Sequence, residues 1–422
     1  MLVYQRNLVA YEFSSPGSKL MNPTSPLPTV TALMATFNRA HLIRESIESL
    51  LGQTRPPDEL IIVNDGSTDN TADVVRSYGS RVRYIEQVNG GKAAALNRVL
   101  PQVESTYIWI FDDDDVALPD ALETHLKFLS EHPRCDFTFS TNYVFSGDFS
   151  EDALKRGKLK TFPADSDQRY LLWIIESQFL PTLMQGMLVP TDCYRAVGAF
   201  DESLLRGQDC DMVLRIARRF RAGLVDQPTF AERVHDGVRG PASERHAEKD
   251  RYRVWRRYKR EIFGKLRSSL LLWEYLPKSA TSTAGIRPLS AIETRDALLQ
   301  RGLVMSVHGL FPEMLDDLAA YVGQLDSSSS ESTNKERQRI STMTCVRDPD
   351  TMPSAGFYRR LGGLCRGRPE LFKATLRGLY WSVTREVRRR RVVPVTQLLG
   401  FAAILGAAYL VPKAERRRGR GA

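Results

Sequence analysis

Short apolar segments alternate with amphipathic segments through the first 130 residues, and this alternation constrains the fold most strongly. Residues 59–64 (ELIIVN) and 107–111 (YIWIF) are largely apolar runs, as expected of strands that are buried on both faces. Residues 41–51 instead carry apolar side chains at the spacing of one helix face. Strands that alternate with helices at this spacing predict an α/β fold with a parallel, doubly wound sheet.

Polar clusters stand where such a sheet would bind ligands, because ligands lie at the carboxyl ends of its strands. Asp65 follows the first apolar run in the turn NDGSTD, and Asp209 opens an amphipathic helix in the sequence GQDCD. Each cluster has a purely structural interpretation, since glycine and short polar residues also form turns and cap helices. A carboxylate at a strand tip nevertheless faces the ligand crevice, so Asp65 is a candidate binding residue.

The most unusual cluster is Asp112–Asp115, which directly follows the apolar run YIWIF. Four adjacent carboxylates repel one another, and no turn requires them. A divalent cation such as Mn²⁺ or Mg²⁺, which prefers carboxylate and phosphate oxygens, would compensate this charge. The alternative is a solvated acidic turn that caps a helix at 118–129. We favour metal and phosphate binding because the cluster ends a core strand.

Several common enzyme motifs are missing from the sequence. No GxGxxG joins the first expected strand and helix, and there is no Walker A, HExxH or GxSxG sequence. These absences argue against nicotinamide dinucleotide enzymes, P-loop hydrolases, zinc proteases and serine hydrolases.

Five sequence elements, taken in order, resemble the nucleotide-sugar-dependent glycosyltransferases of family 2, which have the GT-A fold. They are MATFNR (34–39), VNDGSTDNT (63–71), NGGKAAALN (89–97), FDDDDVALPDAL (111–122) and GAFDESLLRGQDCDMVLRIA (198–217). The resemblance covers about residues 28–240 and implies a Rossmann-like, mostly parallel sheet flanked by helices.

The resemblance also implies roles for individual residues. The nucleotide sugar would be bound by Thr36, Asp65, Lys92, Asp112 and Asp113, with Asp65 toward the nucleobase and Asp112 toward the ribose. The metal would be held by Asp114 and His235, although the run of four aspartates leaves the register uncertain by one residue. Asp209 would be the general base.

These residue types suit the transfer of a sugar from a nucleoside diphosphate. A cation held by carboxylates neutralises the leaving diphosphate, and a carboxylate on the opposite side activates the acceptor hydroxyl, so the anomeric carbon is inverted. We expect a UDP-sugar donor and a glycan or lipid-linked acceptor, in cell-surface polysaccharide or glycolipid synthesis. The alternatives are a catalytically degenerate binding or scaffold protein and a metal-dependent nucleotidyltransferase.

The chain divides by composition into five parts. We predict a flexible lead-in (1–27), the GT-A domain (28–240), a helical extension (241–325), a polar linker with no reason to pack (326–343) and a basic C-terminal region (344–422) with an apolar helix at 392–411.

The net charge of +9 lies entirely in the C-terminal part, because residues 370–422 hold 12 Lys or Arg and three acids. The balanced body gives no support to nucleic-acid binding. Basic residues beside an apolar helix predict attachment to the cytoplasmic face of a membrane, either peripheral or anchored. The alternative is a helix packed on the body with a solvated basic end.

Overall fold

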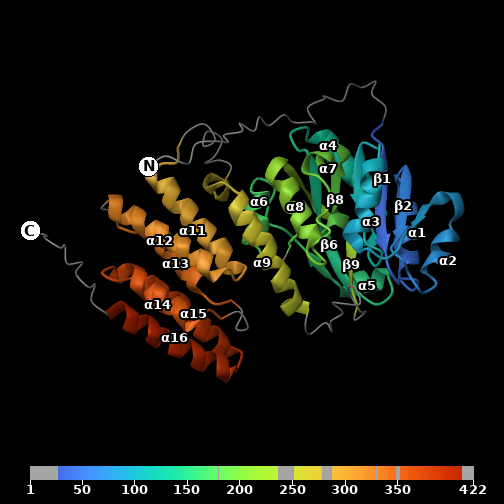
Figure 1. Ribbon diagram of the computed structural model, residues 1–422. Coiled ribbons are helices and arrows are strands. Elements are labelled where there is room, and N and C mark those ends of the chain that lie inside the picture. Colours follow the sequence, from blue (N-terminus) through green and yellow to red (C-terminus); the bar gives the residue numbers. More distant parts are fainter. Residues whose placement is uncertain are drawn as a thin grey trace, which may run out of the picture. The chain divides into compact units, whose positions relative to one another are not determined.

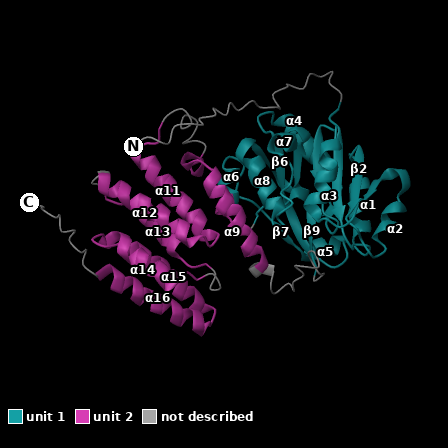
Figure 2. Ribbon diagram, viewed as in Figure 1, with its two compact units in different colours: residues 1–174, 180–252 teal, residues 175–179, 253–422 magenta. Residues whose placement is uncertain are grey.

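The computed structural model describes residues 27–178, 180–235, 251–277, 288–328, 331–347 and 352–410. The chain forms two compact units, residues 1–174 with 180–252 and residues 175–179 with 253–422 (Figure 2). Residues 1–26 of the predicted lead-in lie outside the described residues.

The first unit is built on a nine-stranded sheet with the order β3-β2-β1-β4-β8-β6-β9-β5, and β7 pairs with β6. Strands β1, β2, β3, β4, β6 and β9 run in one direction, whereas β5, β7 and β8 are reversed. The predicted mostly parallel sheet is therefore confirmed. The strands are β1 (Val30–Thr36), β2 (Glu59–Asn64), β3 (Arg83–Glu86), β4 (Tyr107–Ile110), β5 (Val116–Ala117), β6 (Phe137–Ser146), β7 (Lys158–Lys160), β8 (Met187–Pro190) and β9 (Ala222–Val234).

Helices flank this sheet because each carries an apolar stripe that must be buried (Figure 1). In α1 the side chains of Ile43, Ile47 and Leu50, spaced four and three residues apart, are fully buried against the strands. The helices are α1 (Ile43–Leu51), α2 (Thr71–Arg76), α3 (Lys92–Val99), α4 (Ala121–Glu131), α5 (Glu151–Arg156), α6 (Tyr170–Glu176), α7 (Thr191–Val197) and α8 (Gln208–Arg219).

The second unit is helical in its described part, as expected for the C-terminal region. Its long helices are α9 (Arg251–Ser269), α11 (Ala291–Val307), α12 (Phe311–Ser328), α13 (Asn334–Thr344), α14 (Ala355–Leu364), α15 (Pro369–Arg388) and α16 (Val392–Leu410). The predicted division of this region into an extension, a linker and a basic part is not seen, because all these helices belong to one unit.

The prediction of an unpacked linker at 326–343 was wrong, because α12 reaches Ser328 and α13 begins at Asn334. Thr333 and Glu336 form a capping box, in which the backbone N–H of each residue donates a hydrogen bond to the other's side-chain oxygen. Glu336 also accepts from Arg295 at 2.9 Å in a buried ion pair, and Ile340 is fully buried. The polar composition of residues 326–343 gave no indication of these contacts.

Helix α16 corresponds to the apolar helix expected at 392–411. One side packs on the rest of the unit, where Phe401 stacks on Tyr358 of α14 and Tyr409 stacks on Phe372 of α15 at ring separations of 4.5 and 4.0 Å. Leu399 on another side remains 55% exposed. The helix is 19 residues long with a mean hydropathy of 1.7, enough by length and composition to cross a membrane.

Candidate functional site

The carboxyl ends of the central parallel strands bring the predicted residues to one edge of the sheet. Thr36 at the end of β1 stands in register with Asn64 at the end of β2. The carbonyl oxygen of Thr36 accepts a hydrogen bond from the backbone N–H of Asp65 at 2.8 Å. Strand β4 pairs with the other side of β1, so the acidic cluster that follows it comes to the same edge.

The buried carboxylate of Asp65 organises the loop before α3. It accepts hydrogen bonds from Gln87 Nε2 and from the backbone N–H groups of Gly90 and Gly91, at 2.7–2.8 Å. Gly66 has a φ of +73°, and an added Cβ would lie 2.8 Å from the backbone nitrogen of Asn89. A carboxylate offers about four lone-pair positions, so one remains for a ligand.

Lys92 links the acidic cluster to the helix that carries the predicted base. It opens α3, and its Nζ donates to Asp112 Oδ1 at 2.6 Å and to Asp209 Oδ2 at 3.1 Å. Burial alone would lower the pKa of Lys92, but the two carboxylates reverse this and raise it above its ordinary value. The ammonium therefore stays charged.

Asp209 has one oxygen that is held by Lys92 and one buried oxygen without a hydrogen-bond partner in the described part of the chain. It lies in the first turn of α8, after Gly207, which adopts the left-handed conformation with a φ of 79°. Its Oδ2 is held by Lys92, whereas its buried Oδ1 has no hydrogen-bond partner among the described residues. The interpretation of the GQDCD cluster as a helix cap is not supported, because no side chain caps the start of α8.

The four aspartates after β4 divide into two groups. Asp115 is a structural residue, because its oxygens accept from Gln185 Nε2 at 2.7 Å and from the Arg233 backbone at 2.8 Å. Asp114 and His235 are brought together, with Oδ2 and Nε2 separated by 2.9 Å. None of the four caps α4, whose N-cap residue is Asp120 and which has no side-chain cap.

The cluster has the charge of a cation site. Burial, together with the charges of neighbouring aspartates, raises the pKa of Asp112 and brings the pKa of Asp113 to about 7. Carboxylate oxygens of Asp112, Asp114 and Asp115 lie within 4.8 Å of one another. Both oxygens of Asp115 are held by protein donors, one oxygen of Asp112 is held by Lys92, and His235 contacts Asp114, so Asp112, Asp114 and His235 are the residues that could hold a divalent cation.

Sequence reasoning gave no role to Arg39, although it belongs to the first motif. Its Nε lies 3.5 Å from Asp113 Oδ1, and one terminal nitrogen lies 3.8 Å from Asp114 Oδ2. A guanidinium beside these carboxylates can also meet a diphosphate. The backbone contact of Arg233 with Asp115 spans 118 residues and left no local signal.

Direct contacts and chain neighbours connect all eight predicted residues. Asp65 follows β2, and its backbone N–H contacts Thr36 at the tip of β1. Its carboxylate holds Gly91, the residue before Lys92, and Lys92 joins Asp112 to Asp209. Asp113 and Asp114 follow Asp112 in the chain, and Asp114 contacts His235. The structure therefore brings the predicted set together, and the role of each residue remains a prediction.

Comparison with known proteins identifies relatives of the first unit. Residues 31–188 match Glycosyl transferase family 2. An uncharacterised glycosyltransferase of Rickettsia typhi is 28% identical over 214 residues, which are 50% of this chain and 65% of that protein. Chondroitin synthase of Pasteurella multocida is 30% identical over 195 residues, which are 45% of this chain and 19% of that protein.

Comparison with solved structures matches the chain to TarS of S. aureus, residues 1–349, in complex with UDP-GlcNAc. It is 16% identical, covers 86% of this chain and 92% of its own, and has a TM-score of 0.48.

Proposed function

We propose that this chain, whose residues 31–188 belong to glycosyltransferase family 2, is an inverting, metal-dependent glycosyltransferase. It moves a sugar from a nucleoside-diphosphate sugar to a hydroxyl of a glycan or lipid-linked acceptor. One observation carries the proposal most directly: Lys92 joins the predicted base, Asp209, to the acidic cluster that would receive the diphosphate.

Asp209 is suited to activate an acceptor hydroxyl. Its Oδ2 is fixed by Lys92, so the carboxylate cannot rotate freely, and we assign the proton of the acceptor hydroxyl to its buried Oδ1, which has no hydrogen-bond partner among the described residues. Attack from this side displaces the nucleoside diphosphate on the other and inverts the anomeric carbon. A positioned base of this kind contributes roughly 10²- to 10⁴-fold in rate.

The donor would lie along the other residues of the site. We assign the nucleoside to Thr36 and Asp65, with the remaining lone pair of Asp65 toward the nucleobase. The diphosphate is assigned to the neighbourhood of Lys92. Asp112 and Asp113 complete the donor contacts. A Mn²⁺ or Mg²⁺ ion held by Asp112, Asp114 and His235 would supply positive charge to the departing diphosphate.

The class of acceptor is inferred from the surface of the helical unit. The exposed side of α16 and the arginines 388–391, which end α15 and precede α16, suit the cytoplasmic face of an anionic membrane. An enzyme held there would meet a lipid-linked or cell-surface glycan precursor. We therefore propose peripheral attachment, with the packed side of α16 retained on the unit.

The test is the substitution Asp209→Asn, compared with Asp211→Asn. Both lie in the first turn of α8, but Asp211 pairs with Arg215 at 2.9 Å instead of with Lys92. The release of nucleoside diphosphate from UDP-, GDP-, CDP- and dTDP-sugars is measured with native membranes as the source of acceptor. We expect Asp209→Asn to lose at least about 10²-fold in rate and Asp211→Asn to stay near the wild type.

Unchanged turnover in Asp209→Asn would place the base elsewhere. No turnover by the wild-type chain with any donor would favour a binding or scaffold protein.

A further inference from the structure

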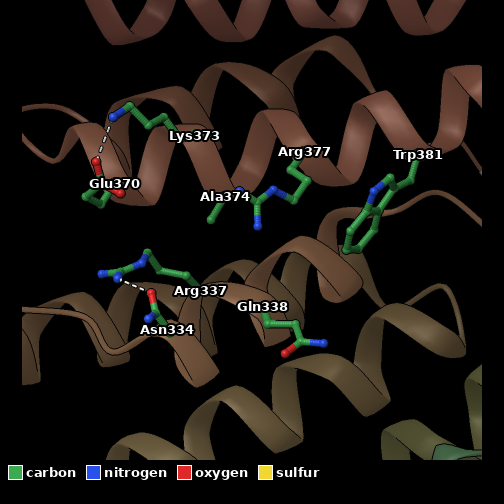
Figure 3. A pocket seen from close by; sticks show the side chains of 8 residues that line it. All are labelled: Asn334, Arg337, Gln338, Glu370, Lys373, Ala374, Arg377 and Trp381. Carbon is green, nitrogen blue, oxygen red and sulfur yellow. Dashed lines mark hydrogen bonds and ion pairs between the residues drawn. The ribbon is translucent and has the colours of Figure 1, made fainter.

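A charged cavity lies in the helical unit, on elements that take no part in the site described above. It has a volume of about 380 Å³ and lies between α13 and α15 (Figure 3). This volume is within the range of roughly 300–1,000 Å³ that is usual for small-ligand sites. Its lining side chains are Asn334, Arg337, Gln338, Glu370, Lys373, Ala374, Arg377 and Trp381.

Helical spacing explains why α15 offers a row of contacts here. Lys373, Arg377 and Trp381 are each four residues apart, so they lie along one side of the helix. Figure 3 shows Arg377 and Trp381 directed from α15 toward the helix that carries Arg337 and Gln338.

The positive charge of the cavity is only partly compensated by the protein. The single carboxylate of the lining, Glu370, accepts a hydrogen bond from Lys373 at 2.8 Å. Arg337 donates to neutral oxygens of Asn334 and Ser332. Arg377 has neither a hydrogen bond nor an ion pair within the described residues, so its guanidinium is available to a ligand.

The same cavity offers contacts for a sugar ring. The indole of Trp381 is 38% exposed beside the guanidinium of Arg377, and the amide of Gln338 stands on the opposite helix. Aromatic faces bind the apolar face of a ring, and amides bind hydroxyl groups. Arginine binds phosphate oxygens through paired N–H donors.

We propose that this cavity binds a phosphorylated saccharide, with the phosphate on Arg377 and Arg337 and the sugar ring on Trp381. This lining combines one aromatic face with two guanidiniums that form no ion pair among the described residues, and it matches a ligand that has both a phosphate and a sugar ring. An anionic bilayer would meet the positive charge but would leave the cavity itself unfilled. This inference stands independently of the proposed transfer reaction, because it concerns a different unit.

The test follows the indole ¹⁵N–¹H NMR signal of Trp381 in the full chain, assigned by its loss in Trp381→Phe. Glucose 1-phosphate is the probe, and glucose and inorganic phosphate are its two component controls. We expect the signal to move with glucose 1-phosphate at concentrations at which neither component alone moves it. The local signal keeps this cavity distinct from any binding at the nucleotide-sugar site.

Arg377→Gln should require at least about tenfold more glucose 1-phosphate for the same shift, since a hydrogen bond to a charged group is lost. Arg359→Gln is the matched control, because Arg359 is an exposed arginine of α14 outside the cavity, and it should titrate like the wild type. Thermal unfolding of both variants checks that they fold.

Two results would overturn the proposal. The first is a Trp381 signal that none of the three probes moves. The second is a signal that responds to phosphatidylglycerol vesicles but not to glucose 1-phosphate, which would make this surface a membrane contact.

Discussion

The ammonium of Lys92 lies 3.1 Å from Oδ2 of Asp209, although the two residues are 117 positions apart in the chain. The same ammonium lies 2.6 Å from Asp112. One cation therefore sets the distance between the predicted base and the predicted diphosphate site. Without it, two carboxylates in a partly buried site would repel each other.

Replacing Lys92 by methionine tests this relationship, because methionine keeps an unbranched side chain and removes the charge. We expect the turnover number to fall about 10²-fold, since a misplaced catalytic group costs roughly that much. Lys92→Arg should recover part of the loss. Lys127→Met removes an exposed lysine of α4 and should have no effect. Equal turnover in Lys92→Met and Lys127→Met would show that Lys92 does not position the base.

The attachment of α16 to a membrane can be tested on its exposed side without unpacking the helix. Leu399→Glu places a charge at a residue that is 55% exposed, and Ile292→Glu does the same at a 66% exposed residue of α11. Burying a leucine contributes about 1.5–3 kcal/mol, so Leu399→Glu should weaken binding to phosphatidylglycerol vesicles at least about tenfold. Ile292→Glu should bind like the wild type in the same sedimentation assay. A wild-type chain that stays in the supernatant would contradict membrane attachment.

Two adjacent glycines of α14 give a sharp test of how α16 packs. A Cβ on Gly362 would lie 2.5 Å from the carbonyl oxygen of Leu405, whereas a Cβ on Gly363 would meet nothing within 4 Å. Gly362→Ala should therefore lower the free energy of unfolding by about 1–3 kcal/mol. Gly363→Ala should leave it unchanged or raise it by up to about 1 kcal/mol, because alanine favours helix. Chemical denaturation measures the free energy of unfolding of the two variants. Equal values would mean that α14 and α16 do not approach this closely.

Local sequence signals predicted the elements that position the site. The expected strand at 59–64 coincides with β2, and the expected strand at 107–111 extends one residue beyond β4. Polar clusters after strands identified the site because parallel strands bring their carboxyl ends to one edge. The start of α13 also has a local signal, since Thr333 and Glu336 have the spacing of a capping box.

Other contacts could not be predicted, because they join segments with no shared local pattern. The burial of Asp115 by Gln185 and Arg233 is set by the reversed β8 and the long β9, whose places in the sheet the sequence does not encode locally. The sequence therefore could not separate the structural aspartate of the run from those that face the site.

The helical unit should lose stability in acid through His308. Burial lowers the pKa of His308 to about 3, and its Nε2 lies 2.9 Å from the carbonyl oxygen of Ile175. The unfolded chain takes up a proton below its ordinary pKa of about 6.5, whereas the folded chain does not until near pH 3. The neutral His308 ring therefore makes its full contribution to the free energy of unfolding above about pH 6.5. This contribution decreases as the pH falls, and at pH 5 it is smaller by about 2 kcal/mol.

His308→Gln removes this proton linkage. The difference in unfolding free energy between the wild type and this variant, measured by urea denaturation, should therefore change by about 2 kcal/mol in favour of the variant between pH 7.5 and pH 5. A difference that is constant across this range would show that His308 is not buried as a neutral ring.

The measurement that tests the central claim most directly is calorimetric titration of the full chain with UDP, GDP, CDP and dTDP, each with and without Mn²⁺. The account predicts that one nucleotide, expected to be UDP, binds only when the metal is present. Asp114→Asn should abolish this binding, whereas Asp120→Asn, at the exposed start of α4, should retain it. Failure of all four nucleotides to bind, or equal binding by Asp114→Asn, would contradict the proposed metal-dependent donor site.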